Sequence, residues 1–232
     1  MPGDHRWTSD EELFAAIRGN LFPAVVGDVM DAMGYIHQFL PPAIQPLRYD
    51  MVVLGRAMPV LEEDIADEEM SPAAEAIRPF GLMLEALDDL KKNEVYLCTG
   101  GTPAYATWGE LMSTRAKRLG AAGAVLNGYS RDTRGILKLG FPTFSIGRFA
   151  QDQRPRGQVV GYRTKVTIGK TVVEPGDLVF GDLDGVLVIP RTVEHDVMRT
   201  AMEKVKREEL VRMAFERENM SASDAVAKFG VM

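Results

Sequence analysis

Between residues 94 and 146 the chain alternates short apolar runs with longer amphipathic segments, and this alternation leaves few folds open to it. Strands and helices are predicted in turn at 95–98, 107–119, 124–126, 133–139 and 141–146. A strand-helix-strand order of this kind favours a mostly parallel sheet with helices packed on it. The chain of 232 residues is long enough for one large domain or two small ones.

After residue 157 the pattern changes to short strands joined by tight turns. The predicted strands lie at 158–168, 171–173, 178–181 and 186–190. Pro175 followed by Gly176 is typical of a type II turn, and Asp184-Gly185 is typical of a hairpin. This part of the chain therefore predicts a second, β-rich sheet.

The N-terminal part is predicted to begin with two helices. Ser9 and Glu12 form a capping box at the start of the first, and the second runs from about 24 to 33 and stops at Gly34. Residues 52–57 are strand-like.

A longer helix is predicted from 71 to about 92. Its buried stripe consists of Ala73, Ile77, Phe80, Leu84 and Leu87. At the other end of the chain, a charged amphipathic helix is expected at about 192–217, followed by a further helix or tail at 220–232.

The charge balance is mildly acidic. The chain has 27 Lys and Arg against 33 Asp and Glu, a formal net charge of −6, and no basic block. It therefore lacks the electrostatic footprint of a protein that binds nucleic acid or an anionic membrane, and an anionic ligand needs a local site.

Residues 1–12 hold no apolar leader segment, and no apolar run approaches the roughly 18 residues of a membrane span. We expect no nucleic-acid partner, no membrane and a cytoplasmic location.

Several features that suggest chemistry have simpler interpretations. The triplet at 169–171, Gly-Lys-Thr, lacks the upstream glycine of a phosphate loop, and we interpret it as a hairpin tip. His5, His37 and His195 show no metal-ligand spacing. Cys98, the single cysteine, excludes an intrachain disulfide and is predicted to be buried at the end of an apolar strand.

Two segments carry residues suited to an anion or a hard cation. Residues 108–113 begin a predicted helix, whose free N–H groups and dipole favour a carboxylate or phosphate. Residues 127–132 follow a predicted strand, and open α/β sheets bind ligands at the carboxyl ends of strands. Arg131 and Asp132 offer a guanidinium for an oxyanion and a carboxylate for a cation. Alone, such a pair would be interpreted as a surface ion pair.

The pair does not stand alone. Three stretches follow in order, WGELMSTRAKRLGAAGAVLNGYSRDTRGI at 108–136, FPTFSIGR at 141–148 and VEPGDLVFGDLDGVLVIP at 173–190. Together they resemble the divalent-metal-dependent class II pyruvate aldolases. The best-known members of that family are the 4-hydroxy-4-methyl-2-oxoglutarate/4-carboxy-4-hydroxy-2-oxoadipate aldolases, and it includes the regulator of ribonuclease activity A. The resemblance covers about residues 24–190.

The resemblance implies a three-layer β/β/α swivel-type fold of the α/β class, with N- and C-terminal helices. We expect a single domain over 1–232, with its core at about 24–190 and a C-terminal helical extension at about 192–232. The resemblance also implies a homotrimer or homohexamer with its sites at subunit interfaces.

The family's site residues fall on Gly109, Glu110, Leu111, Met112, Arg131 and Asp132. In the family the first four form a substrate-binding turn, the arginine binds substrate, and the aspartate binds the metal, Mg²⁺ or Mn²⁺. Asp28 matches a recurring family aspartate with a structural role. The chain departs from the family at Asn127-Gly128, where Asp-Gly is usual, and in the distinctive segment QDQRPRG at 151–157.

The predicted reaction is retro-aldol cleavage of a 4-hydroxy-2-oxo acid to pyruvate and a second carbonyl product, with decarboxylation of oxaloacetate as a related activity. Asp132 would anchor the ion, the amides of 109–112 would hold the pyruvyl carboxylate, and the ion and Arg131 would stabilise the enolate. The C4 hydroxyl proton would pass to an ordered water or a carboxylate, with Glu110 as a supporting candidate.

Other functions stay open. A non-catalytic binding protein like the ribonuclease regulator needs no metal ligand, so the presence of Arg131 and Asp132 favours catalysis. A lyase for a sugar-derived 2-oxo acid would use the same site. A Schiff-base aldolase built on Lys138 or Lys165 is disfavoured, because no residue near them in sequence would activate a lysine.

Overall fold

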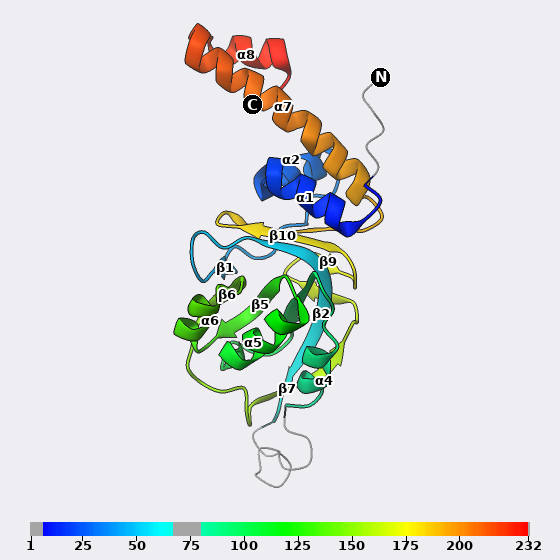
Figure 1. Ribbon diagram of the computed structural model, residues 1–232, viewed down its shortest axis with the longest axis vertical. Helices are drawn as coiled ribbons and strands as arrows, with labels where there is room; N and C mark the ends of the chain where they lie inside the picture. The colour runs from blue at the N-terminus through cyan, green and yellow to red at the C-terminus, as the bar shows by residue number, and fades with distance from the viewer. Residues whose placement is uncertain (1–6, 67–79, 232) are drawn as a thin grey trace. The chain divides into compact units, whose positions relative to one another are not determined.

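The computed structural model describes residues 7–66 and 80–231, and the chain falls into two compact units (Figure 1). The helical unit comprises Met1–Ile36 and Thr192–Met232, and the sheet unit comprises His37–Arg191. The single-domain organisation expected for 1–232 stays a prediction.

The sheet unit is built on a nine-stranded sheet of parallel and antiparallel pairs. Its strands are β1 (Gln45–Pro46), β2 (Val53–Asp64), β3 (Glu94–Thr99), β4 (Ala106–Trp108), β5 (Gly123–Ser130), β6 (Thr143–Arg148), β7 (Gly157–Tyr162), β10 (Leu178–Asp182) and β11 (Gly185–Ile189). The order is β1-β6-β5-β3-β2-β10-β11, with β4 beside β5 and β7 beside β2. Strands β8 (Val166–Ile168) and β9 (Thr171–Val173) form a separate hairpin, whose tip is Gly169-Lys170 as predicted.

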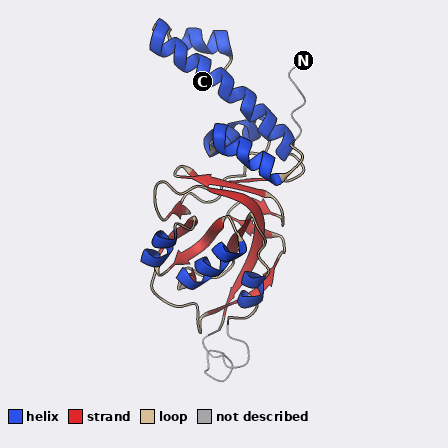
Figure 2. Ribbon diagram, in the orientation of Figure 1, coloured by secondary structure: helices blue, strands red, loops and turns tan. Residues whose placement is uncertain are grey.

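Helices cover one face of this sheet (Figure 2). They are α4 (Met83–Asp88), α5 (Glu110–Leu119) and α6 (Thr133–Leu139). Strands β2, β3, β5 and β6 are parallel, whereas β10 and β7 pair antiparallel with the first and last parts of β2. The long β2 curves across the unit (Figure 1) and joins these two sets of strands. The predicted α/β class, with helical and β layers, is confirmed. The second β-rich sheet predicted after residue 157 is wrong, because β7 and β10 pair with β2 in the same sheet, and only the β8–β9 hairpin is separate.

Several predicted elements have different bounds: the strand predicted at 52–57 is β2, which extends to Asp64, and the strand predicted at 141–146 is β6, which begins at Thr143. Residues 127–130, expected to follow the strand predicted at 124–126, belong to β5. Residues 107–108 lie in β4, so α5 begins at Glu110 and not at 107. The predicted strand at 158–168 is two strands, β7 and β8. Strand pairing explains the differences at 107–108 and 127–130, because β4 and the end of β5 pair with each other.

The helix predicted at 71–92 is not continuous in the described residues: it is interrupted at 80–82, and only 83–88 are helical, as α4. Its first part, 71–79, lies outside the described residues. Phe80 and Gly81 have left-handed φ values of 65° and 62°, which end any helix there. Gly81 instead forms a β-bridge with Val159, and α4 is a separate short helix.

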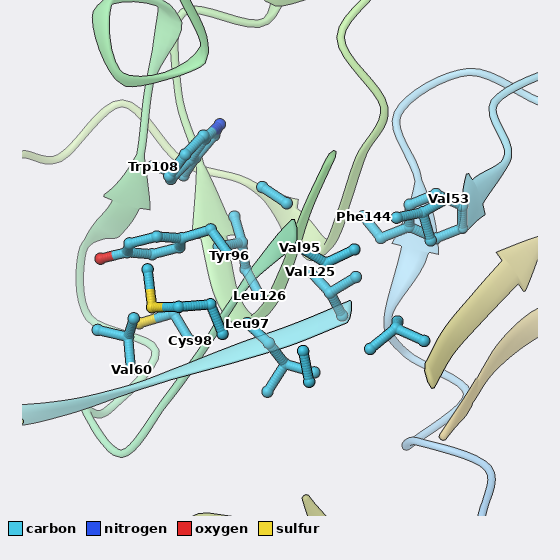
Figure 3. Close-up of a cluster of buried hydrophobic side chains, with 14 of the residues drawn as sticks. Val53, Val60, Val95, Tyr96, Leu97, Cys98, Trp108, Val125, Leu126 and Phe144 are labelled. Atoms are coloured by element: carbon cyan, nitrogen blue, oxygen red, sulfur yellow. The ribbon is translucent and has the colours of Figure 1, made fainter. Parts of the chain in front are cut away.

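The core of the sheet unit contains the apolar side chains of the central strands. Figure 3 shows Val53, Val60, Val95, Leu97, Val125, Leu126 and Phe144 among them. The rings of Tyr96 and Trp108 pack with centroids 4.7 Å apart. Cys98 is buried as predicted, and burial raises the pKa of its thiol well above the usual range, so it is an unreactive core group.

The helical unit contains α1 (Asp10–Asn20), α2 (Pro23–Ala32), α7 (Glu194–Glu218) and α8 (Ala222–Phe229). The Ser9 hydroxyl accepts a hydrogen bond from the Glu12 N–H at 3.2 Å, as the capping box predicts. Asp28 forms an ion pair with Lys204 at 2.5 Å.

Within the described ranges no single helix is long and apolar enough to cross a membrane. Helices α1 and α2 reach that length and hydropathy only when they are taken together, across a 106° bend.

Candidate functional site

Three parallel strands end at the same edge of the sheet. Strand β5 pairs with β4 and with β6, and Ser130 at its end lies opposite Trp108 of β4. Gly109 follows β4, Arg131 follows β5, and residues 149–153 follow β6. Strand pairing therefore brings together three segments that are distant in sequence.

Trp108 holds the first two segments in place. Its indole Nε1 donates a hydrogen bond to the Ser113 hydroxyl at 2.7 Å, and that hydroxyl donates to the Gly109 carbonyl at 3.0 Å. The carbonyl of Trp108 itself accepts from the Arg131 N–H at 2.9 Å. Because Trp108 is fully buried, the first turn of α5 and the start of the Arg131 segment are fixed to the core.

Arg131 and Asp132 form the turn between β5 and α6. Asp132 is left-handed, with φ 56° and ψ 33°, a conformation that aspartate adopts more readily than most residues. Its Oδ2 accepts from the Glu110 N–H at 3.4 Å and lies 3.9 Å from Arg131 Nε. Arg131 Nη2 lies 3.3 Å from Asp152 Oδ1. The guanidinium therefore lies between two carboxylates.

A cavity of about 260 Å³ opens beside this turn. Its polar end contains Gly109, Arg131, Asp132, Asp152 and Gln153. The rest of the wall is mainly apolar and includes Phe80, Met83, Leu84, Leu87, Leu111 and Met112. Leu84, predicted to be buried on a helix stripe, is 51% exposed here, and Leu111 is 81% exposed.

A second hollow of about 230 Å³ shares Arg131 and Asp132 with the cavity and adds Arg148. The Arg148 guanidinium donates from Nη2 to the Leu47 carbonyl at 3.1 Å. The turn thus separates an apolar space from a more cationic one.

The structure brings most of the predicted site residues together. Those that line the cavity are Gly109, Leu111, Met112, Arg131 and Asp132. Glu110 does not line it, because its side chain packs on α6, where a Cβ at Gly135 would lie 2.5 Å from Glu110 Cγ. Asn127 is also absent from the cavity wall, and its Nδ2 donates to Thr99 Oγ1 at 3.0 Å. The roles assigned to these residues stay predictions.

Asp152 and Gln153 are cavity residues to which the sequence assigned no role. They belong to the segment 151–157, which differs from the family pattern. They also follow β6, the third parallel strand that ends at this edge. The strand-end argument that selected Arg131 would have selected them too, had it been applied to β6.

A buried carboxyl lies next to Gln153. Glu62 of β2 is 1% exposed, and the Tyr105 hydroxyl and the Gln153 amide lie near it. Within the described part of the chain, neither Glu62 oxygen has a partner that meets full hydrogen-bond geometry, and neither does Gln153 Nε2. Burial raises the pKa of Glu62 to about 8, and the charge of Asp64 adds to this rise. The polar groups of Tyr105 and Gln153 act in the opposite direction and lower the pKa. Glu62 is therefore mainly neutral at pH 7.

Asp132 suits a divalent cation that keeps most of its water. Its side chain is 51% exposed, and Mg²⁺ sites commonly use one or two carboxylates together with substrate oxygens. Residues 7–66 and 80–231 contain no group of three His, Cys, Asp or Glu that could enclose a metal, and His37 and His195 belong to none. His5 lies outside the described residues. The donor set fits an open site and not an all-protein cage.

Comparison with known proteins assigns the fold that builds this cavity. Residues 24–188 match the RraA-like family, described as Aldolase/RraA. The chain belongs to the RraA-like family. The matched range includes all the described residues that line the cavity.

RraA-like relatives differ in name and length. A protein of Halalkalibacterium halodurans, provisionally named 4-hydroxy-4-methyl-2-oxoglutarate aldolase, is 32% identical over 53% of this chain and 58% of its own length. Protein DlpA of Legionella pneumophila is 26% identical over 84% of this chain and 30% of its own length. The match therefore spans less than two thirds of either relative.

A solved structure shares the fold. Streptomyces coelicolor RraAS2, described as an unusual member of the RNase ES inhibitor RraA family, aligns with a TM-score of 0.76 at 22% identity. The alignment covers 90% of this chain and 100% of that one.

Proposed function

We propose that this RraA-like protein is a divalent-metal-dependent lyase that cleaves a 4-hydroxy-2-oxo acid to pyruvate and a second carbonyl compound. The observation that carries the proposal is the Arg131–Asp132 pair, held beside the first turn of α5 in one cavity. A carboxylate for a hard cation and a guanidinium for a developing oxyanion are what this reaction requires. The family and the aldolase name of the H. halodurans relative support it.

Different groups of the site would bind the metal ion and the substrate carboxylate. Asp132 would hold Mg²⁺ or Mn²⁺, which when bound supplies Lewis-acid polarisation of the C2 oxygen. The first-turn amides of α5 at Leu111 and Met112 would hold the pyruvyl carboxylate, since first-turn N–H groups have no partner within their own helix. The amide of Glu110 is already directed to Asp132.

Cleavage breaks the C3–C4 bond. The C4 hydroxyl loses its proton and becomes the carbonyl of the second product, while the bonding electron pair passes to the C2 oxygen as an enolate. Arg131 stabilises that charge where it develops, and protonation of C3 gives pyruvate. We assign Asp152, the second carboxylate of the polar end, to receive the C4 proton. Loss of CO₂ from oxaloacetate leaves the same enolate.

The test is pyruvate release from 4-hydroxy-2-oxo acids, sugar-derived 2-oxo acids and oxaloacetate, by protein treated with a chelator and then supplied with Mg²⁺ or Mn²⁺. Release that needs the cation and survives borohydride supports the proposal. Covalent trapping of substrate on a lysine would replace it with the Schiff-base mechanism. No release from any compound, together with inhibition of a ribonuclease, would favour the non-catalytic regulator class. The homotrimeric or homohexameric state and the cytoplasmic location stay predictions.

Arg131→Lys should lower kcat/KM by about 10²–10³-fold while divalent-cation affinity is retained. Lysine keeps the charge but lacks the planar guanidinium, which can contact Asp152 and the substrate at the same time. Steady-state kinetics and cation titration measure the two effects. Loss of cation binding in this variant would contradict the separate roles of Arg131 and Asp132.

Gly109→Ala should lower kcat/KM by about 10²-fold without lowering Tm. A Cβ at 109 would lie 2.8 Å from Asp132 Oδ2, so the carboxylate must move, whereas the extended backbone of Gly109 accepts any residue. Gly19→Ala is the control, because its Cβ would meet nothing within 4 Å. Equal kinetics for both variants would show that the position of the Asp132 carboxylate is not critical.

A further inference from the structure

The cavity beside Arg131 is lined by one cationic side chain from the part of the chain that the structure describes. Among the described residues that line it, Arg131 alone carries positive charge, and it already faces Asp132 and Asp152. The pyruvyl half of a 4-hydroxy-2-oxo acid, with its carboxylate and C2 oxygen, would occupy this polar end under the proposed function.

The rest of the same cavity is apolar. Met83 and Leu87 are buried on the inner part of the wall, while Leu84 and Leu111 are exposed and line its open part. Single exposed leucines are common on protein surfaces, but these two border one cavity that continues from the polar end. A substrate held at Arg131 must direct its C4 substituent along this wall or into the second hollow.

The chemistry of the wall favours one class of substituent. A carboxylate placed there would lose water without gaining a cation from the described residues of the wall, and would lie in a cavity that already holds two aspartates. An alkyl or aryl group would bury apolar surface against the leucines and methionine. The second hollow offers Arg148, which donates one hydrogen bond to the Leu47 carbonyl and keeps its charge, so a C4 carboxylate would be favoured there and not on the apolar wall. Of the two spaces, the one lined by the first turn of α5, where the pyruvyl carboxylate would bind, is the cavity with the apolar wall.

We propose that the substrate carries an apolar alkyl or aryl group on C4, and that Leu84, Leu87 and Leu111 form the subsite for it. This inference rests on the proposed lyase function and adds the class of substrate to it. It separates this chain from an aldolase whose substrate carries a second carboxylate on C4.

The test compares two 4-hydroxy-2-oxo acids that differ only at C4, one with an isopropyl group and one with a carboxylate of nearly the same shape. We expect kcat/KM for pyruvate release to be higher for the isopropyl compound by about 10²-fold. Equal values, or a preference for the carboxylate, would overturn the inference and leave the lyase function standing. Cleavage of neither compound would overturn the inference, and the wider screen of 2-oxo acids would then decide whether the lyase function stands.

Leu84→Lys tests the subsite itself. A cation on the apolar wall should shift the ratio of the two kcat/KM values by about 10-fold toward the carboxylate compound. Leu183→Lys is the matched control, because Leu183 is 54% exposed and lies outside the cavity. An unchanged ratio in Leu84→Lys would overturn the assignment. Equal loss of both activities with a smaller sedimentation coefficient would also overturn it, and would show that a second copy of the chain covers this wall.

Discussion

Asp132→Asn should reduce divalent-cation-dependent pyruvate release by at least about 10³-fold and leave the protein folded. The amide keeps the shape of the carboxylate but removes the charge that would hold the ion. Asparagine also accepts the left-handed φ of 56° found at this position. Because the side chain is half exposed at a strand end, its loss should change Tm little. Steady-state kinetics, cation titration and thermal melting measure these effects, and excess Mg²⁺ or Mn²⁺ should restore part of the activity.

Two further variants make this result specific. Asp132→Ala should show the same loss of activity. It should also lower the stability of the fold slightly, because alanine adopts the left-handed conformation less readily than aspartate or asparagine. Asp184→Asn changes another exposed aspartate, in the β10–β11 turn, and should match the wild type in every assay. Full activity of Asp132→Asn, or a loss explained by early melting, would show that Arg131 and Asp132 are a structural turn.

Glu62→Gln should stabilise the protein at pH 8 and above. The folded-state pKa of Glu62, about 8, lies above its ordinary value of 4.5, because burial disfavours the charged form. The contribution of the neutral carboxyl to stability is complete below pH 4.5, falls as the pH rises, and is lost above about pH 8. Glutamine has no proton to lose, so the variant should not show this fall.

The size of the effect follows from the pKa difference. One pKa unit corresponds to about 1.4 kcal/mol, so the free energy of unfolding of the wild type should fall by on the order of 4–5 kcal/mol relative to the variant between pH 4.5 and 8. Urea unfolding at pH 5, 7 and 8.5 measures it. Glu63→Gln, at the exposed neighbouring position in β2, is the matched control and should follow the wild type. Parallel curves for Glu62→Gln and wild type would refute the assignment of a neutral buried carboxyl.

Local patterns were sufficient for much of the fold. The helix predicted at 133–139 is α6 with the same bounds, and the capping residue Ser9 begins α1 as expected. These predictions succeeded because helix periodicity and capping are decided by residues within a few positions of one another.

The errors fall where distant segments pair. The helix that the apolar spacing predicts is interrupted at Phe80 and Gly81, where Gly81 bridges to Val159, 78 positions further along the chain. Trp108 was placed in a helix, yet it lies in β4 opposite Ser130. The stability of such a strand depends on packing against its partner strand. A prediction from neighbouring residues in the sequence does not include that partner.

The sequence by itself determined the reactive groups of the candidate site. Arg131 and Asp132 follow a predicted strand and lie within the range that matches the RraA-like family, so a guanidinium and a carboxylate could be assigned to the candidate site before any coordinates. Only the tertiary structure placed Asp152 against Arg131, put Leu84 on the cavity wall, and enclosed Glu62 so that its proton is retained. The physical reason is that charge and donor type belong to a residue, whereas burial, pKa and the shape of a cavity belong to its surroundings, which strand pairing assembles from distant parts of the chain.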